Sequence, residues 1–384
     1  MRFAHLSDSH LGNRQYGIFE REEDYYEIFD KTIDKIIELD VDFVIHSGDL
    51  FDSSRPSTNA FLAFQRGLLK LNNAGIPMYA IAGNHDIVMR KGIKPPIDLF
   101  EELGLNILRH DNGFIEGDVF ICGVQFIPSS QKRVLDMVLD RFSNEAKNHS
   151  KSIIVLHQGI KKFIDYGDDS FELELNELPT NFNYYAMGHL HNYITEDLGN
   201  GKLIYPGSME VSKSNEIAQI DNKGFCVVDL SGDEPSVERI TVEISRKQCK
   251  SNIKYSELND KLSKLKAQIQ DLDKKPLLNL IVYGGDLNSS DVHELIHEEI
   301  GKDVLNLKIS YIPEKEIEDN THRLPTLNPK SYLWDRINEK YDDEVIANLS
   351  VNLLETLSEN RMGDAKSISD IYFDATYPYE NDDE

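Results

Sequence analysis

The sequence is poor in tryptophan, in cysteine and in basic residues. It contains one tryptophan and three cysteines among 384 residues. The cysteines, Cys122, Cys226 and Cys249, are far apart, and two of them lie in apolar strand-like segments. We therefore expect buried free thiols, and neither disulfide bonds nor a zinc–thiolate site.

Segments that target or anchor a protein are also missing. The N-terminal sequence MRFAHLSDSH has neither the basic region nor the apolar region of a signal peptide. No apolar run approaches the length of about 20 residues that crosses a bilayer. We expect a soluble intracellular protein with no membrane segment.

Basic residues are outnumbered by acidic ones, 41 against 67, which gives a formal charge of −26. This excess argues against a protein that coats nucleic acid through a generally positive surface. It leaves open an enzyme that acts on phosphates, because carboxylates that bind divalent metals add negative charge. Residues 51–100 carry six Lys and Arg against three Asp and Glu. A surface that meets phosphate groups should therefore draw on this block, with Arg55, Arg90 and Lys91 as candidates.

The order of apolar segments predicts the fold class. Near the N-terminus the strand-like segments RFAHL, DFVIHS and MYAIA alternate with helical segments at about 21–39 and 58–73. This rhythm predicts a parallel sheet flanked by helices. After Asn106 short strand-like segments dominate, and they predict a second, mixed sheet packed against the first.

The pattern changes near Arg246 and again at Pro313. We expect a main domain at 1–245, a small α/β domain at 246–312, a proline-containing linker at 313–330 and a helical segment at 331–384 that ends in an acidic tail. The small domain should contain two strands, LLNLIVYG and VLNLKISYI, that alternate with two helices. The helical segment carries an apolar stripe that includes Val345, Leu349, Leu353 and Leu357.

Five polar clusters each follow an apolar strand-like segment. Because the carboxyl ends of strands in α/β sheets meet at one edge, all five can face one site. Side chains at positions i and i+2 of an extended chain project to the same side, so two of the clusters can each supply a pair of ligands. The residues are Asp8 with His10, Asp49, Asn84 with His85, His157, and His189 with His191.

The chemistry of these side chains indicates a metal site. Carboxylate, imidazole and amide donors without cysteine favour manganese or a similar octahedral ion. Seven ligands suit two ions roughly 3.5–4 Å apart that share a carboxylate, for which Asp49 is the candidate. Such a pair activates a water molecule and clamps the oxygens of a phosphoryl displacement. We assign His85 to the substrate, as a proton donor to the leaving oxygen.

The motifs DSH, GDLFD, GNHD, LHQG and GHLH, in this order, resemble the calcineurin-like metallophosphoesterases, whose pattern is D-x-H, G-D, G-N-H, H and G-H-x-H. Longer segments, among them GDLFDSSRPS and LPTNFNYYAMGHLH, look like the archaeal nuclease subunit of the double-strand-break repair complex, the meiotic-recombination-eleven family, whose bacterial relative is SbcD. The resemblance covers 1–245 and rests beyond that on domain order. It implies a four-layer α/β/β/α sandwich, a small capping domain and a C-terminal helical segment.

The resemblance also implies how the ligands are divided. One Mn²⁺ would take Asp8, His10, Asp49 and His191, and the other Asp49, Asn84, His157 and His189. His85 matches the catalytic histidine of the family. Some archaeal members have a histidine where this chain has Asp52, and a carboxylate there cannot donate a proton at neutral pH.

The activity and partners that the resemblance implies are those of DNA-end processing. They are a manganese-dependent 3′-to-5′ exonuclease on duplex ends and an endonuclease on single strands, in a homodimer within a heterotetramer with a Rad-fifty-type ATPase. We then expect a cytoplasmic, nucleoid-associated protein, with Arg55, Arg90 and Lys91 against DNA and the stripe of Val345, Leu349, Leu353 and Leu357 against the ATPase. The candidate dimer residues are Phe61, Leu62, Phe64, Leu68 and Leu69, although a stripe of this kind is more often core.

Two other functions fit part of the sequence. The same scaffold serves phosphatases and small-molecule phosphodiesterases. Protein phosphatases of the superfamily carry an arginine in GDxVDRG, whereas this chain has GDLFDSS. A non-catalytic DNA-tethering subunit is the other alternative, and the intact set of metal positions disfavours it.

Overall fold

The computed structural model describes residues 1–87, 92, 94–164, 171–213, 216–314, 334, 337 and 344–358. The chain forms two compact units, one of residues 1–282 with 288–311 and the other of 283–287 with 312–384. In the described ranges, no helix combines the length and the apolar character that a membrane span requires.

The first sheet has the strand order β12-β11-β1-β2-β3-β4. The four strands from β1 to β4 run parallel, and β11 and β12 continue the sheet in antiparallel pairs. Its strands are β1 (Arg2–Leu6), β2 (Phe43–His46), β3 (Met78–Ala80), β4 (Leu105–Ile107), β11 (Gly224–Asp229) and β12 (Ser236–Thr241). The outer face is covered by α1 (Phe19–Glu38) and α2 (Thr58–Asn73), which pack on it through buried apolar residues.

The second sheet has the strand order β5-β6-β7-β8-β10-β9. The inner four strands are parallel, while the two edge strands pair antiparallel with their neighbours. Its strands are β5 (Gly113–Glu116), β6 (Val119–Val124), β7 (Lys151–His157), β8 (Tyr184–Gly188), β10 (Gly201–Tyr205) and β9 (Ile194–Leu198). The helix α3 (Lys132–Ala146) covers its outer face.

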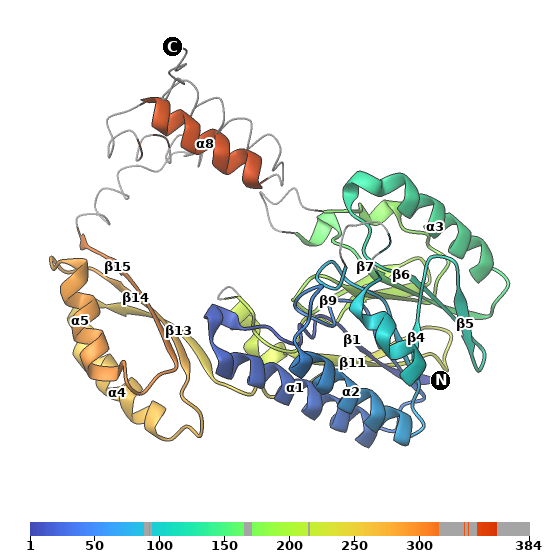
Figure 1. Ribbon diagram of the computed structural model, residues 1–384, viewed down its shortest axis with the longest axis horizontal. Coiled ribbons are helices and arrows are strands. Elements are labelled where there is room, and N and C mark those ends of the chain that lie inside the picture. The colour runs from blue at the N-terminus through green and yellow to red at the C-terminus, as the bar shows by residue number, and fades with distance from the viewer. Residues whose placement is uncertain are drawn as a thin grey trace, which may run out of the picture. The chain divides into compact units, whose positions relative to one another are not determined.

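A third apolar core joins the inner faces of the two sheets. Phe3 and Phe43 of the first sheet lie in this core with Ile153 and Tyr184 of the second. Figure 1 shows α1 and α2 on one side of the paired sheets and α3 on the other. The predicted four-layer α/β/β/α sandwich is therefore confirmed.

Two details differ from the sequence prediction. Strands β4, β11 and β12 belong to the first sheet, although β4 contains Asn106 and the other two follow it, where we expected strands of the second sheet. The reason is register: β11 pairs with β1, from Arg2 opposite Asp229 to His5 opposite Cys226, so the chain returns to the first sheet. Helix α3 was also missed, although Leu135, Leu139 and Phe142 recur at helical spacing and are buried.

The small α/β part contains one more strand than the two that the sequence pattern indicated. Three strands form its sheet, in the order β13-β14-β15, with two helices beside them. Its elements are β13 (Gln248–Lys254), α4 (Leu258–Gln270), β14 (Leu277–Tyr283), α5 (Ser289–Ile300) and β15 (Asn306–Ile312). The extra strand β13 has mostly polar side chains, so it lacks the apolar run by which the other two were recognised.

Buried charges connect this part to α1. The carboxylate of Asp24 accepts hydrogen bonds from Arg21 Nη1 at 2.7 Å, from Arg246 Nε at 2.7 Å and from Lys274 Nζ at 3.1 Å. Asp24 and Arg21 are fully buried. Because a buried charge without a partner is costly, this cluster couples α1 to both ends of the segment that leads into β14.

The exposed apolar residues bear on the expected interfaces. On α2, Phe64 and Leu68 are buried in the core of the chain itself, whereas Leu62 and Leu69 are 46% and 44% exposed. A dimer contact through α2 would therefore use Leu62 and Leu69 with the half-buried Phe61.

The described part of the C-terminal unit includes the 15-residue helix α8 (Glu344–Ser358). Val345 is 62% exposed there, and Leu349 and Leu353 are half-buried. The side chain of Leu357 lies outside the described residues, as do the expected acidic tail and most of the linker at 313–330.

Candidate metal centre

The polar clusters lie at the carboxyl ends of five strands, as the sheet geometry requires. Asp8 and His10 follow β1, Asp49 follows β2, and Asn84 follows β3. His157 is the last residue of β7, and His189 and His191 follow β8. The structure brings all seven together in one continuous set of contacts, although they span residues 8 to 191.

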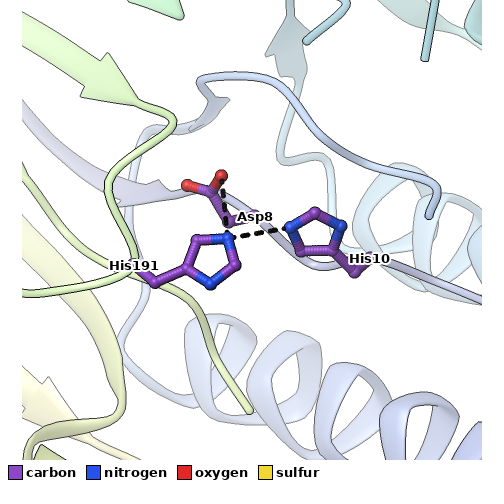
Figure 2. Close-up of side chains that lie close together, drawn as sticks. All are labelled: Asp8, His10 and His191. Atoms are coloured by element: carbon purple, nitrogen blue, oxygen red, sulfur yellow. Dashed lines mark hydrogen bonds and ion pairs between the residues drawn. The ribbon is translucent and has the colours of Figure 1, made fainter. Parts of the chain in front are cut away.

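One group consists of Asp8, His10 and His191 (Figure 2). The Nε2 atoms of His10 and His191 lie 3.1 Å apart, and His191 Nε2 lies 3.9 Å from Asp8 Oδ1. Asp8 is fully buried and His10 almost so. Two imidazole nitrogens and a carboxylate oxygen thus converge from two different sheets.

The other group surrounds Asn84 and Asp49. Asn84 Oδ1 lies 3.0 Å from both His157 Nε2 and His189 Nδ1. Asp49 Oδ2 lies 3.3 Å from His157 Nε2 and 3.8 Å from His10 Nε2. Asp49 is therefore the residue that lies between the two groups.

The backbone is strained where these ligands lie. Positive φ is uncommon for residues other than glycine, and it occurs at six such positions of the described chain. Four of the six belong to the cluster: Asp8 at 52°, His10 at 43°, Asp49 at 51° and His189 at 95°. Strain of this kind concentrates at functional sites, where the surrounding structure holds it in place.

Two glycines allow the loops to approach one another. A Cβ at Gly83 would lie 2.1 Å from Asp49 Oδ1, and one at Gly188 would lie 2.1 Å from the carbonyl oxygen of Ser47. Any side chain at these positions would push the loops apart. The glycines in the GNHD and GHLH motifs are thus required by the packing of the site.

The carboxylates make the cluster attractive to positive charge. Burial alone would lower the pKa of His10 and His157, but nearby carboxylates outweigh burial and raise both values to about 9. Burial alone would raise the pKa of Asp49, but His157 and His10 hold it well below its usual range. His189 differs, because burial and the neighbouring His157 lower its pKa to about 4.

These observations fit divalent cations. Asp8, His10 and His191 offer ligand atoms within 4.8 Å of one another, and so do Asp8, Asp49 and His157. The donors are oxygen and nitrogen without sulfur, as hard or borderline divalent ions prefer. The two facing Nε2 atoms of His10 and His191 cannot both present lone pairs at 3.1 Å without a proton or a cation between them.

His85 lies beside the cluster and is exposed. Its ring packs edge to face with His10 at 4.8 Å, and its backbone N–H donates to Asp49 Oδ1 at 2.9 Å. Its Nδ1 lies 2.9 Å from the carbonyl oxygen of Asp52, which can only accept. The Nδ1 atom therefore carries a proton, and Nε2 is left for a partner outside the chain.

Asp52 contacts the site through its carboxylate and its carbonyl oxygen, and it offers no imidazole that could donate a proton. Its Oδ1 accepts from Asn13 Nδ2 at 2.7 Å and lies 3.4 Å from His10 Nδ1. His10, Asp52 and His85 form a third group of close ligand atoms. The carboxylate of Asp52 thus faces His10, while its carbonyl holds His85.

Several supporting residues were not predicted from the sequence. The buried Asp86 accepts hydrogen bonds from the N–H groups of Leu50, Phe51 and Gly83 at 3.0, 2.8 and 2.9 Å. It ties the loop after β2 to the loop after β3. Its place in the GNHD motif, next to His85, is the signal that could have identified it.

Ser47 is a second such residue. Its carbonyl oxygen accepts from His157 Nδ1 at 2.8 Å, so the Nε2 atom of His157 is the one turned to the site. Its hydroxyl lies 2.9 Å from His5 Nε2, and His5 Nδ1 lies 2.9 Å from the Tyr184 hydroxyl. His46 is buried with Nε2 2.6 Å from Ser9 Oγ. His5 and His46 are thus not candidate ligands. They form hydrogen bonds to Ser47 and Ser9, which lie next to the ligands in the sequence or in space.

Glu216 is the third. Its Oε1 lies 2.9 Å from His191 Nδ1, and its Oε2 accepts from Lys223 Nζ at 2.9 Å. Burial alone would raise the pKa of Glu216, but His191 and Lys223 outweigh burial and hold that pKa well below its usual range. Glu216 lies in none of the metal motifs and is 25 residues from His191 in the sequence, so no local pattern identified it.

The residues expected to meet phosphate groups are only partly placed. Arg55 is exposed in the loop between β2 and α2, three residues after Asp52. Arg90 and Lys91 lie outside the described residues.

Comparison with known proteins gives consistent matches. Residues 1–193 match the family described as calcineurin-like phosphoesterase. The DNA double-strand break repair protein Mre11 of Methanococcus maripaludis is 32% identical over 393 residues, which cover 98% of this chain and 100% of the relative. Mre11 of Methanocaldococcus jannaschii is 37% identical over 69% of this chain and 74% of its own. Mre11 of Thermoplasma acidophilum is 30% identical over 96% of this chain and 98% of its own.

Proposed function

Because the chain belongs to the Mre11 family of DNA double-strand break repair proteins within the calcineurin-like phosphoesterases, we propose that it is a metal-dependent nuclease that processes DNA ends. Membership makes it a hydrolase of phosphodiester bonds. The observation that supports the proposal most is the single contact network of Asp8, His10, Asp49, Asn84, His157, His189 and His191, with His85 exposed beside it.

The cofactor in this proposal is a pair of Mn²⁺ ions. Asp8, His10, Asp49 and His191 would hold one ion, and Asp49, Asn84, His157 and His189 the other. A bound pair supplies Lewis acidity toward a water molecule and toward the phosphoryl oxygens. Asp49 suits the shared position because its carboxylate lies near His10 and His157 alike.

The chain's own groups prepare the site before substrate arrives. The hydrogen bond from His157 Nδ1 to Ser47 turns Nε2, the atom that would bind the ion, toward Asp49 and Asn84. The strained backbone at Asp8 and Asp49 stays in place because the two sheets and the buried Asp86 hold the loops together. The positions of the candidate ligands are therefore fixed when the chain folds, so the site needs little reorganisation during the reaction.

His85 is the residue that we assign to proton transfer. Its Nδ1–H is bound to the carbonyl oxygen of Asp52, so Nε2 is the ring atom left to hold the proton that would be transferred. From there the proton would pass to the leaving oxygen of a phosphodiester bound at the site. Asp52 acts here through its main chain, which explains how a carboxylate is tolerated at this position.

The remaining assignments are part of the same proposal. DNA, as duplex ends or single strands, would meet Arg55, and the part at 246–312 would cap the nuclease domain at 1–245. The apolar side of α8 would bind a Rad-fifty-type ATPase beyond the linker at 313–330. Leu62 and Leu69 of α2 would form the homodimer contact, in a heterotetramer located with the nucleoid.

A cleavage assay tests the proposal. The purified chain is incubated with blunt duplex, hairpin and single-stranded DNA, with Mn²⁺ or with a chelator, beside the His85→Ala variant. We expect 3′-to-5′ degradation of duplex ends and cutting of single strands with Mn²⁺, and neither with chelator or the variant. Efficient turnover of a phosphopeptide without action on DNA would favour the phosphatase alternative. A chain that binds no metal would favour the tethering alternative.

A further inference from the structure

The loop after β10 is a sixth loop at the same sheet edge, and none of the metal motifs lies in it. Its described residues, up to position 213 and from 216 onward, place Ser208, Ser212, Glu216 and Lys223 beside His191. Glu216 and Lys223 are 5% and 2% exposed. This loop therefore contacts the candidate metal centre at the Nδ1 edge of His191, whereas Nε2 of the same ring faces Asp8 and His10.

Both ends of His191 are bound by this loop. On the ring, Nδ1 lies 2.9 Å from Glu216 Oε1 and 3.0 Å from Ser212 Oγ. On the backbone, the carbonyl oxygen accepts from the Ser208 N–H and from Lys223 Nζ, both at 3.1 Å. The backbone contacts thus fix the position of His191, and the ring contacts fix the rotation of its imidazole.

The hydrogen-bond directions decide which ring nitrogen carries the proton. Ser212 donates to Glu216 through its hydroxyl at 2.8 Å and through its N–H at 3.2 Å, so the Ser212 hydroxyl proton is already used. Both neighbours of His191 Nδ1 can then only accept, and Nδ1 must be the donor. In the neutral ring the lone pair is consequently on Nε2, the atom that faces Asp8 and His10.

Lys223 fixes the carboxylate itself. Its ammonium group donates to Glu216 Oε2 at 2.9 Å, to Ser208 Oγ at 2.6 Å and to the carbonyl oxygen of His191. Removing two such charges from water costs free energy that their attraction often fails to recover. A buried pair in this place is therefore better explained by orientation of His191 than by stability.

We propose that Glu216, held by Lys223, is a positioning residue for His191 that keeps the proton on Nδ1 and directs the Nε2 lone pair into the metal centre. The proposal rests on the function proposed above, because it takes His191 as a ligand. A carboxylate behind a ligand imidazole also makes the ligand more basic, and loss of such a partner typically weakens metal binding about 10- to 100-fold.

Three variants of the full chain separate this role from a structural one. Glu216→Gln removes the charge and lets the ring adopt either tautomer. Glu216→Gln with Lys223→Met removes both charges, so that no buried ammonium is left without a partner. Glu210→Gln is the matched control, because Glu210 is buried in the same loop and paired with Arg21, and its carboxylate binds Val211 N–H and Gln248.

The first measurement needs no metal. Long-range ¹H–¹⁵N correlation spectra of the chelator-treated, histidine-labelled chain report the tautomer of each ring, and His191→Asn assigns the signal. We expect the Nδ1–H tautomer in the wild type and in Glu210→Gln, and a mixture in both Glu216 variants. An Nε2–H tautomer in the wild type would overturn the proposal.

The second measurement is calorimetric titration with Mn²⁺ alone. We expect both Glu216 variants to bind their weaker ion about 10- to 100-fold less tightly than the wild type, and Glu210→Gln to match the wild type. Unchanged affinity in the double variant, or an equal loss in Glu210→Gln, would contradict the proposal. A wild type that binds no Mn²⁺ would instead refute the proposed function, and the tautomer then decides the role of Glu216 by itself.

Discussion

The Nε2 atoms of His10 and His191 lie 3.1 Å apart, although 181 residues separate them in the sequence. His10 comes from the first sheet and His191 from the second. Their meeting depends on the packing of the two sheets against each other, so the integrity of the metal centre and that of the sandwich are linked.

Replacement of the central carboxylate should affect both ions, whereas replacement of a ligand from one group should affect one. We expect Asp49→Ala to bind no Mn²⁺ pair and His191→Ala to keep one ion, because Asp49 lies between the groups. Metal analysis after dialysis against Mn²⁺ measures this. Asp118→Asn, at an exposed carboxylate paired with Lys151, is the control. Two ions retained in Asp49→Ala would refute the shared position.

His85→Asn should separate metal binding from catalysis. The variant keeps the N–H group that binds Asp49 but loses the proton donor at Nε2. We expect Mn²⁺ binding close to that of the wild type and a rate of DNA cleavage at least about 100-fold lower. Titration with Mn²⁺ and a single-turnover assay on the same preparation give the two values. A large loss of metal affinity would show that His85 is a ligand instead.

The metal-free chain should lose stability as the pH rises from about 6.5 to 9. The pKa values of His10 and His157 are raised to about 9 in the folded chain, above the unfolded value of about 6.5. Their contribution is therefore fully present below pH 6.5 and is lost as the pH passes through 9. We expect urea unfolding with chelator to show a decrease on the order of 3 kcal/mol for each of the two imidazoles.

Saturating Mn²⁺ should remove this dependence, because the cation replaces the protons that the two imidazoles carry. The same titration with Mn²⁺ is thus the internal control. A metal-free chain that is equally stable at pH 6.5 and pH 9 would show that the two imidazoles are not protonated in the folded state.

Asp24→Asn should destabilise the chain strongly. The substitution removes the carboxylate that the buried Arg21 and Arg246 share, so Arg21 keeps only Glu210 as an acidic partner and Arg246 loses its ion pair with Asp24. We expect a loss of about 3–5 kcal/mol in the free energy of unfolding, the usual effect of breaking a buried ion pair. Asp30→Asn is the control, since Asp30 and its partner Lys70 are both partly exposed and ion pairs near the surface contribute less than about 1 kcal/mol. Equal effects of the two substitutions would contradict the role of Asp24.

Removal of residues 330–384 should separate partner binding from the nuclease. We expect the shortened chain to keep Mn²⁺-dependent cutting of DNA, because all seven candidate ligands and His85 lie before residue 192. It should no longer co-purify with the Rad-fifty-type ATPase. The double variant Val345→Asp with Leu349→Asp in the full chain tests α8 alone. Retention of the ATPase by both would place the contact elsewhere.

The sequence by itself determined most of the elements, apart from α3 and β13, and the candidate ligands of the site. Each ligand follows an apolar strand, and the carboxyl ends of parallel strands meet at one edge, so local patterns were enough to place Asp8, Asp49 and His157 at a common site. The helices α1 and α2 were predicted within two residues of their observed bounds, because apolar periodicity is a local property.

The tertiary structure decided what depends on contacts between distant segments. The membership of β11 in the first sheet follows from its register with β1, which no local pattern contains. The burial of Phe64 follows from packing of α2 on the sheet and on α1. The pairing of Glu216 with His191 depends on a return of the chain after β10, so the residue that orients a ligand became visible only when the loops were in place.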